Sequence, residues 1–441
     1  MPLVTALMAA LLAWLAPQPS PDRFTRDFEV FADGEAITVV EAGCARCDWG
    51  EEGREAAVLR VSLDGNYSQH IALVHGDQPA KYPVALGPVV KGSHRLTIER
   101  DPELSAPGAG PATIAVPEVS VFRASQGSAF SVLSMAPILY ARPNTVGKFT
   151  DLPLLMWCET DTTDRGHRYR YSVVFSNEDG GTQTDRLMAT WGRTTDIEFV
   201  YGVEVDESGK VVAEEFQGPG HEVPRFKGQH EGRHPLLWVS TDNNMVSETG
   251  PTRIRYRLEP QPFDLTDQAR EAVMDASAWT YAIAAVEMRR EGKIAADPPP
   301  GINKIPDPRR FVFVEACGTI GNAALAISVG SGRLQPDRAL TWTSSDRGLP
   351  QYRIVRDGCF TIATPLPVGA RPSDIRAIRV HAFERPSSEG QARPAADAVT
   401  FTRINKVFML DEQYHPGRSI LEWKGSETLL PGGDPFEVKV P

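Results

Sequence analysis

The stretch TDIEFVYGVEV, from Thr195 to Val205, decides the fold class. Apolar side chains occupy every second position from residue 197 to residue 205, which is the period of a β-strand with one face on a core. Comparable segments recur along the chain, separated by turn signals such as Asp64-Gly65 and Asp357-Gly358. We therefore expect a mainly β protein made of several β-sandwich domains, with one long helix between the second and third modules.

The expected helix is a long segment without proline. No Pro occurs between Thr266 and Glu291, and the cations Arg289 and Arg290 suit the negative end of a helix dipole. The residues that follow are rich in Pro and are typical of a linker. From the N-terminus, the expected organisation is a signal peptide (1–20), an N-terminal β-sandwich module (25–128), a central β-sandwich domain (130–262), a helix (264–293), a Pro-rich linker (294–308) and a C-terminal β module (309–441).

The first residues indicate export. Pro2 to Ala16 form a continuous apolar run that is too short to span a bilayer comfortably, and PQPSP follows it. We expect no transmembrane segment beyond this signal peptide, and a secreted or periplasmic location. The net charge of −11 repels phosphate backbones, so we expect no nucleic-acid partner.

The five cysteines suit an oxidising compartment. Cys44 and Cys47 form a C-x-x-C without a second Cys/His pair, which favours a tight loop disulfide over a zinc site. Cys317 and Cys359 lie in strand-like segments and can bridge two strands. Cys158 then remains as a buried free thiol.

Acidic residues gather around the opening stretch. Asp196 and Glu198 stand two apart on the expected strand, so they share a face at about 7 Å. Glu178 and Asp179 lie in a Gly-rich loop that follows another strand, YRYSVVF. If the two strands are neighbours, these oxygen ligands can hold a divalent cation, with calcium or magnesium expected before zinc. The alternative is a solvated acidic turn beside a solvated strand face.

The order of these motifs resembles the superfamily of the necrosis- and ethylene-inducing-peptide-like cytolysins and the plant family named after vacuolar protein sorting protein 62. The resemblance covers residues from about 135 to 250 and centres on Trp191–Glu198, WGRTTDIE. It implies a β-sandwich with a divalent-cation site that assists binding of a membrane sphingolipid headgroup. Asp196 and Glu198 match the Asp and Glu of the family motif G-H-R-H-D-W-E, and Asp179 matches an upstream Asp. Arg193 and Thr195 stand where the motif has histidines.

Histidines offer a second set of candidate ligands. His230-Glu-Gly-Arg-His234 matches H-E-x-x-H, which binds zinc when a helix places both histidines on one face. Gly232 and Pro235 argue against a helix here. A looped pair can still bind a metal together with His221.

Polar and aromatic residues suggest a sugar-binding surface. Asp242 and Asn243 lie in a segment dense in hydrogen-bonding groups, STDNNM, and Trp191 or Trp238 offers a stacking face. Our first hypothesis is an exported binding protein whose central sandwich recognises a glycan or lipid headgroup, with a cation assisting. One alternative is a metal-dependent hydrolase that uses the acidic cluster or His221, His230 and His234. The other is a structural envelope or adhesion protein.

Overall fold

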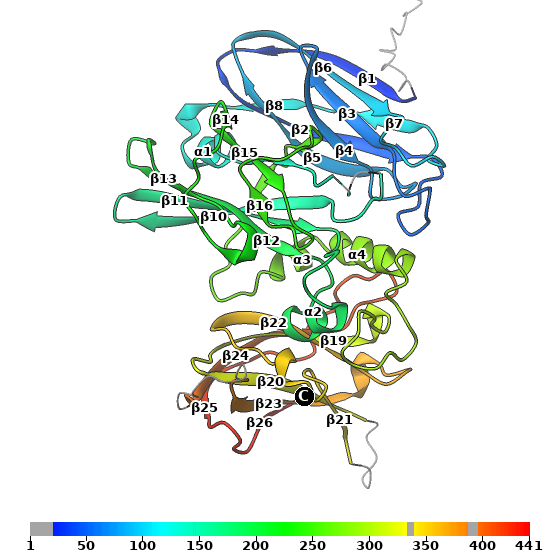
Figure 1. Cartoon of the computed structure of the whole chain (residues 1–441), viewed down its shortest axis with the longest axis vertical. Helices are drawn as coiled ribbons and strands as arrows, with labels where there is room; N and C mark the ends of the chain where they lie inside the picture. Colours follow the sequence, from blue (N-terminus) through cyan, green and yellow to red (C-terminus); the bar gives the residue numbers. More distant parts are fainter. Residues whose placement is uncertain (1–20, 144, 146, 333–338, 387–395) are drawn as a thin grey trace, which may run out of the picture.

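The computed structural model describes residues 21–143, 145, 147–332, 339–386 and 396–441. The expected signal peptide, 1–20, lies outside this range. The described residues form six β-sheets and a few short helices, which confirms the mainly β class (Figure 1). No helix within the described ranges is long and apolar enough to cross a membrane.

The N-terminal sandwich packs two antiparallel sheets around one core that contains Val40, Leu59 and Ile98. The first sheet has the order β1 (Arg23–Val30), β6 (Gly92–Asp101), β3 (Val58–Leu63) and β4 (Asn66–Ala72). The second has the order β5 (Ala80–Val89), β2 (Gly34–Cys44) and β7 (Ala112–Ala115), with β8 (Val119–Phe122) also on β2.

The central sandwich begins after η1 (Ala124–Gln126) and α1 (Ser128–Ser134). Its larger sheet has the order β13 (Val211–Glu215), β12 (Ile197–Asp206), β11 (Gly166–Phe175), β10 (Pro153–Thr163) and β18 (Pro260–Pro262). Its second sheet has the order β14 (His230–Glu231), β15 (His234–Val239), β9 (Ile138–Tyr140) and β17 (Arg255–Tyr256), with β16 (Val246–Ser247) on β15. The helix α2 (Thr184–Trp191) and the turn η2 (Pro219–His221) are inserted between strands.

The C-terminal sandwich follows the turn η3 (Pro308–Arg310). One sheet has the order β22 (Gly358–Pro365), β19 (Phe311–Thr319), β24 (Val399–Phe408) and β25 (Trp423–Leu429). The other has the order β21 (Thr341–Ser344), β20 (Ala323–Ser331), β23 (Ile375–Glu384) and β26 (Phe436–Lys439). The turns η4 (Pro350–Tyr352) and η5 (Pro372–Asp374) lie in the connections.

Strand β12, which contains the opening stretch, departs from the expected single buried face. The register with β11 shifts between Tyr171 and Ser172, so a bulge interrupts the alternation. A bulge inserts one residue and turns the strand past that point. As a result Ile197 enters a core shared with the C-terminal sandwich, whereas Val200 and Tyr201 enter the core of the central one. Asp196 and Glu198 are buried rather than solvated.

The long helix expected over 264–293 is wrong in its extent. The structure has α3 (Ala272–Ala276) and α4 (Trp279–Arg290), which are separated at Ser277. Upstream, the Asp264 carboxylate accepts the Thr266 N–H at 2.8 Å, and Asp267 has a positive φ of 58°. Short polar side chains that bond to the nearby backbone in this way favour turns over a helix.

The Pro-rich segment 294–308, expected to be a linker, packs against the rest of the chain. Ile305 is fully buried and forms a β-bridge with Ile294. The backbone N–H of Gly301 donates to Asp185 of α2 at 2.6 Å. The segment is therefore a strap that helps to fix α2.

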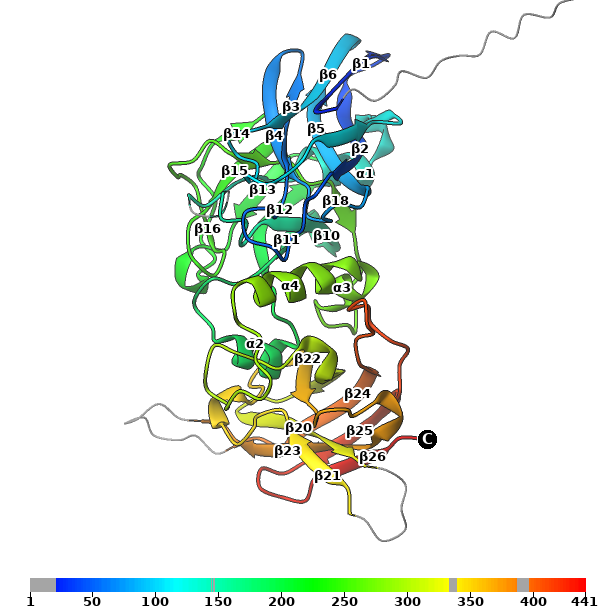
Figure 2. The same ribbon diagram turned by 90° about the vertical axis from the view of Figure 1, so that its right-hand side faces the viewer.

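The central and C-terminal sandwiches share one apolar core around α3 and α4. Trp157 and Ile197 from the central sandwich meet Met274 and Tyr281 from the helices and Phe313 from β19. Figure 2 shows both helices between the two groups of sheets. Gly192, which ends α2 at a φ of 60°, lies so close to Thr361 of β22 that a Cβ would clash. The two sandwiches are therefore in close contact at the end of α2.

The structure forms two disulfides, Cys44–Cys47 and Cys317–Cys359. Cys317 and Cys359 stand directly opposite each other on β19 and β22, as the strand-like segments around them suggest. Cys158 is a buried free cysteine, and burial raises the pKa of its thiol to about 12. It therefore stays protonated at neutral pH.

Candidate functional site

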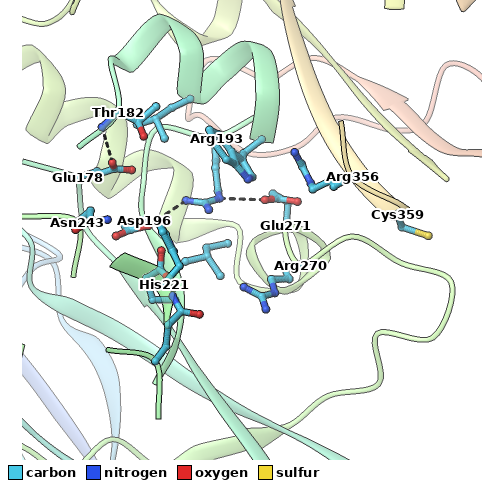
Figure 3. Close-up of a pocket in the computed structure, with 15 residues that line it drawn as sticks. Glu178, Thr182, Arg193, Asp196, His221, Asn243, Arg270, Glu271, Arg356 and Cys359 are labelled. Carbon is cyan, nitrogen blue, oxygen red and sulfur yellow. Dashed lines mark hydrogen bonds and ion pairs between the residues drawn. The ribbon is translucent and has the colours of Figure 1, made fainter. Parts of the chain in front are cut away.

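A cavity of about 440 Å³ lies where the central sandwich meets the C-terminal one (Figure 3). One wall comes from α2, the start of β12 and the loops of the central sandwich. The opposite wall comes from the turn before α3 and from the start of β22. The volume falls within the range of roughly 300 to 1,000 Å³ that is common for small-molecule sites.

Three carboxyl groups that the sequence singled out line this cavity: Glu178, Asp196 and Glu198. Burial, followed by the charge of Asp196, raises the pKa of Glu198 to about 9. The same two causes raise the pKa of Glu178 to about 7, and burial also raises the pKa of Asp196. Glu198 is therefore protonated at neutral pH, and the cavity holds a mixture of neutral and ionised acids.

Neighbouring side chains fix Asp196 and Glu198 at the start of β12. Asn244 donates to the Asp196 carboxylate at 3.1 Å, and Gln217 donates to Glu198. Arg193, which is buried, lies 3.7 Å from Asp196. Its charge is a cause that holds down the pKa values of Asp196, Glu178 and Glu198. Arg193 therefore limits how far these acids are neutralised.

The loop that carries Glu178 is held close to the turn of residues 241–244. The Glu178 carboxylate accepts the Thr182 N–H at 2.9 Å. Gly181 has a φ of 94°, and a Cβ there would press on both Glu178 and Asn243. Glycine is suited to this position because it tolerates both the positive φ and the close approach. The result places Glu178 and Asn243 together in the lining.

The opposite wall supplies further charge. Arg193 donates to Glu271 at 3.0 Å. Arg356 donates to the Thr190 carbonyl at 2.7 Å, and its guanidinium lies 5.4 Å from the centre of the Trp191 ring. Arg270 also lines the cavity. Figure 3 shows Arg193, Arg270 and Arg356 around Glu271.

Two of the predicted acids lie elsewhere. Asp179 is not part of the cavity lining, and its carboxylate pairs with Arg142 at 2.6 Å. Asp242 also pairs with Arg142, and its side chain is 68% exposed. The prediction that Asp179 joins Asp196 and Glu198 is therefore wrong, because Arg142 binds it, while its neighbour Glu178 enters the cavity.

The two tryptophans are also separated. Trp191 lines the cavity. Trp238 stacks on Tyr140 with ring centres 4.3 Å apart and donates to the Thr252 carbonyl at 3.1 Å. Trp238 is not among the lining residues, so of the two tryptophans it is Trp191 that can stack on a ligand in this cavity.

The three candidate histidines have separate surroundings. His221 lines the cavity. His230 pairs with Glu214 at 2.7 Å, and His234 is buried against Glu35 and the Ala136 carbonyl. His230 and His234 belong to two antiparallel strands, β14 and β15, and not to a helix. The helical geometry that H-E-x-x-H needs for zinc is therefore absent here.

The donor set does not support the predicted cation site. Within the described ranges, no group of three or more His, Cys, Asp or Glu side chains is placed to hold a metal ion. Arg193 already supplies positive charge beside Asp196. The divalent cation remains a prediction from the sequence.

Sequence reasoning missed part of the lining, notably Gln217, Arg270, Glu271 and Arg356. Arg270 and Glu271 lie in the segment that was expected to be helical. Arg356 immediately precedes the Asp357-Gly358 turn signal. No local pattern connects these residues to Asp196, because the contact between the two sandwiches brings them together.

No protein-family model and no curated protein matches the chain. Among solved structures, the chain is similar to the C-terminal domain of the sugar-binding protein EclA, at 13% identity and a TM-score of 0.17, over 26% of this chain and 84% of that one. It is also similar to a family 35 carbohydrate-binding module from an environmental isolate, at 8% identity and a TM-score of 0.15, over 26% and 86% of the two chains. A GH2 β-galacturonidase from Eisenbergiella tayi matches at 12% identity and a TM-score of 0.14, over 46% of this chain and 28% of that one. Such low TM-scores carry no conclusion about function.

Proposed function

We propose that the chain is an exported glycan-binding protein that holds its ligand in the cavity between the central and C-terminal sandwiches. The proposal rests on the set of side chains that line this cavity. Acceptors such as Asp196, donors such as Asn243 and the ring of Trp191 all lie around one space of about 440 Å³.

This lining suits sugar hydroxyls. Each hydroxyl both donates and accepts hydrogen bonds, so a sugar needs both kinds of partner. The side-chain amide of Asn243 can donate, while the carboxyl oxygens of Asp196 and Glu198 accept. A tryptophan ring can cover an apolar patch of a sugar ring. The proposal needs no cation, because the side chains already provide both donors and acceptors.

Asn243 offers the cleanest test, because its neighbour on the same turn is a matched control. Asn243 is half-buried in the cavity lining, whereas the adjacent Asp242 points to Arg142. We expect Asn243→Ala to weaken glycan binding by about tenfold, as for a lost hydrogen bond to a polar ligand. Asp242→Ala should change the affinity by less than about twofold.

The measurement starts with wild-type protein on an array of neutral and acidic glycans. Titration calorimetry then compares both variants with the best oligosaccharide, and circular dichroism checks that each variant is folded. Equal affinity of Asn243→Ala and wild type would place the ligand elsewhere. An array without any bound glycan would refute the proposed function.

A further inference from the structure

Two guanidinium groups that line the cavity, those of Arg270 and Arg356, form no ion pair in the described residues. Arg193 is already matched by Asp196 and Glu271. Arg356 donates a hydrogen bond to the carbonyl of Thr190. Neither Arg356 nor Arg270 forms an ion pair within the part of the chain that the structure describes. Glu271 is the acid whose charge acts most on Arg356, but Glu271 already accepts a hydrogen bond from Arg193.

The guanidinium of Arg356 is poorly solvated. Burial lowers the pKa of its guanidinium to about 10, so the group stays charged at neutral pH in a poorly solvated place. Buried charges are normally paired, because desolvation is otherwise uncompensated. A charged arginine at a cavity wall that forms no ion pair can bind an anionic ligand.

The acids of the cavity have other hydrogen-bond or ion-pair partners. Glu198 accepts a hydrogen bond from Gln217, and burial raises the pKa of Glu198 to about 9. Asp196 and Glu271 share Arg193 between them. Glu178 accepts the Thr182 N–H. Figure 3 shows Glu178 and Thr182 on one side of the cavity and Glu271 and Arg356 on the other. An anionic group that enters here meets the guanidinium groups of Arg270 and Arg356 beside a Glu271 that is already bonded to Arg193.

We propose that Arg270 and Arg356 bind the carboxylate of a uronic-acid residue, so the preferred ligand is an acidic glycan. This inference rests on the proposed function, because it names the glycan class for the same cavity. A planar guanidinium presents paired N–H donors that match the two oxygens of a carboxylate. The neutral part of the sugar then lies toward Trp191 and Asn243.

The test uses tetrasaccharides of glucuronate, galacturonate and mannuronate, each as the free acid and as the methyl ester. The two forms differ in charge but not in sugar configuration. Calorimetry at fixed ionic strength compares wild type with Arg270→Met, Arg356→Met and Arg356→Lys. In at least one series we expect the free acid to bind at least about tenfold more tightly than the ester. Both Met variants should bring the two forms to within about twofold by weakening the free acid much more than the ester, and Arg356→Lys should keep part of the preference.

The experiment distinguishes failure of the anion subsite from failure of the carboxylate assignment. If the esters bind as well as the acids, the anion subsite is refuted but glycan binding stands. If sulfated neutral sugars bind more tightly than every uronate, the carboxylate assignment is refuted in favour of a sulfate. If neither acid nor ester binds in any series, this inference is refuted, whereas the proposed function is refuted only if no glycan of the array binds.

Discussion

Replacing Arg193 with methionine is expected to destabilise the chain by about 3 to 5 kcal/mol at pH 7.5, as for breaking a buried ion pair. Arg193 is buried, donates to Glu271 at 3.0 Å and lies 3.7 Å from Asp196. It also donates to the Thr195 carbonyl. Methionine fills much of the same space but leaves the two acids without a cation and the carbonyl without its donor.

The loss of stability in Arg193→Met should depend on pH. Without Arg193 the pKa values of Asp196, Glu178 and Glu198 rise further, because its charge is a cause that lowers them. The folded variant then binds more protons than the unfolded chain, so its stability falls as pH rises. Urea unfolding followed by tryptophan fluorescence should show a smaller deficit at pH 5 than at pH 7.5.

Arg270→Met is the matched control for this prediction. Arg270 lines the same cavity, but its side chain is exposed and forms no ion pair in the described ranges. Its loss should change stability by less than about 0.5 kcal/mol. Equal stability of Arg193→Met and Arg270→Met would show that Arg193 is not the cation that holds the acids of the cavity.

The second large effect is expected at Glu287 of α4, where Glu287→Gln should stabilise the chain by about 3 kcal/mol at pH 8. Glu287 is fully buried and accepts the Trp49 indole N–H at 3.0 Å. Burial, followed by the charge of Glu291, raises its pKa to about 7 from the usual 4.5. Glutamine keeps an acceptor for Trp49 and carries no charge.

The sign follows from proton linkage. A carboxyl group whose pKa is raised by folding contributes its full stability below the unfolded pKa. It loses that stability as pH rises through the folded pKa. The window here runs from about 4.5 to about 7. The advantage of Glu287→Gln should therefore be absent near pH 4 and complete above pH 8.

Unfolding midpoints in urea, measured from pH 4 to pH 8.5, test this prediction. The exposed Glu103 provides a control, since Glu103→Gln should give a difference from wild type that is flat across the series. A Glu287→Gln variant that is less stable than wild type at pH 8 would contradict the argument. In that case the carboxylate of Glu287 would have to be stabilised in its ionised form.

Local pattern in the sequence was enough to predict the fold class and several of the cavity residues. The alternation in 197–205 does form β12, and Asp196 and Glu198 do lie together. The bulge opposite Tyr171 was not predictable, because it depends on how β11 and β12 pair. This bulge sends Ile197 and Val200 to different cores.

The loop acids show a second limit of the sequence. Glu178 and Asp179 are adjacent acidic residues, so the sequence gives no reason to predict which of them lines the cavity. Arg142, which is 37 residues away from Asp179, decides the matter by pairing with it. Likewise, Arg193 meets Glu271 across 78 residues, through a contact that no local periodicity encodes.

The most direct test of glycan binding in the cavity is a crystal structure with the tightest-binding oligosaccharide from the array. The proposal predicts sugar density between the two sandwiches, within hydrogen-bond distance of Asn243 and of Asp196 or Glu198. Sugar bound on an outer sheet face, with the space beside Asp196 and Glu198 filled only by water, would contradict it.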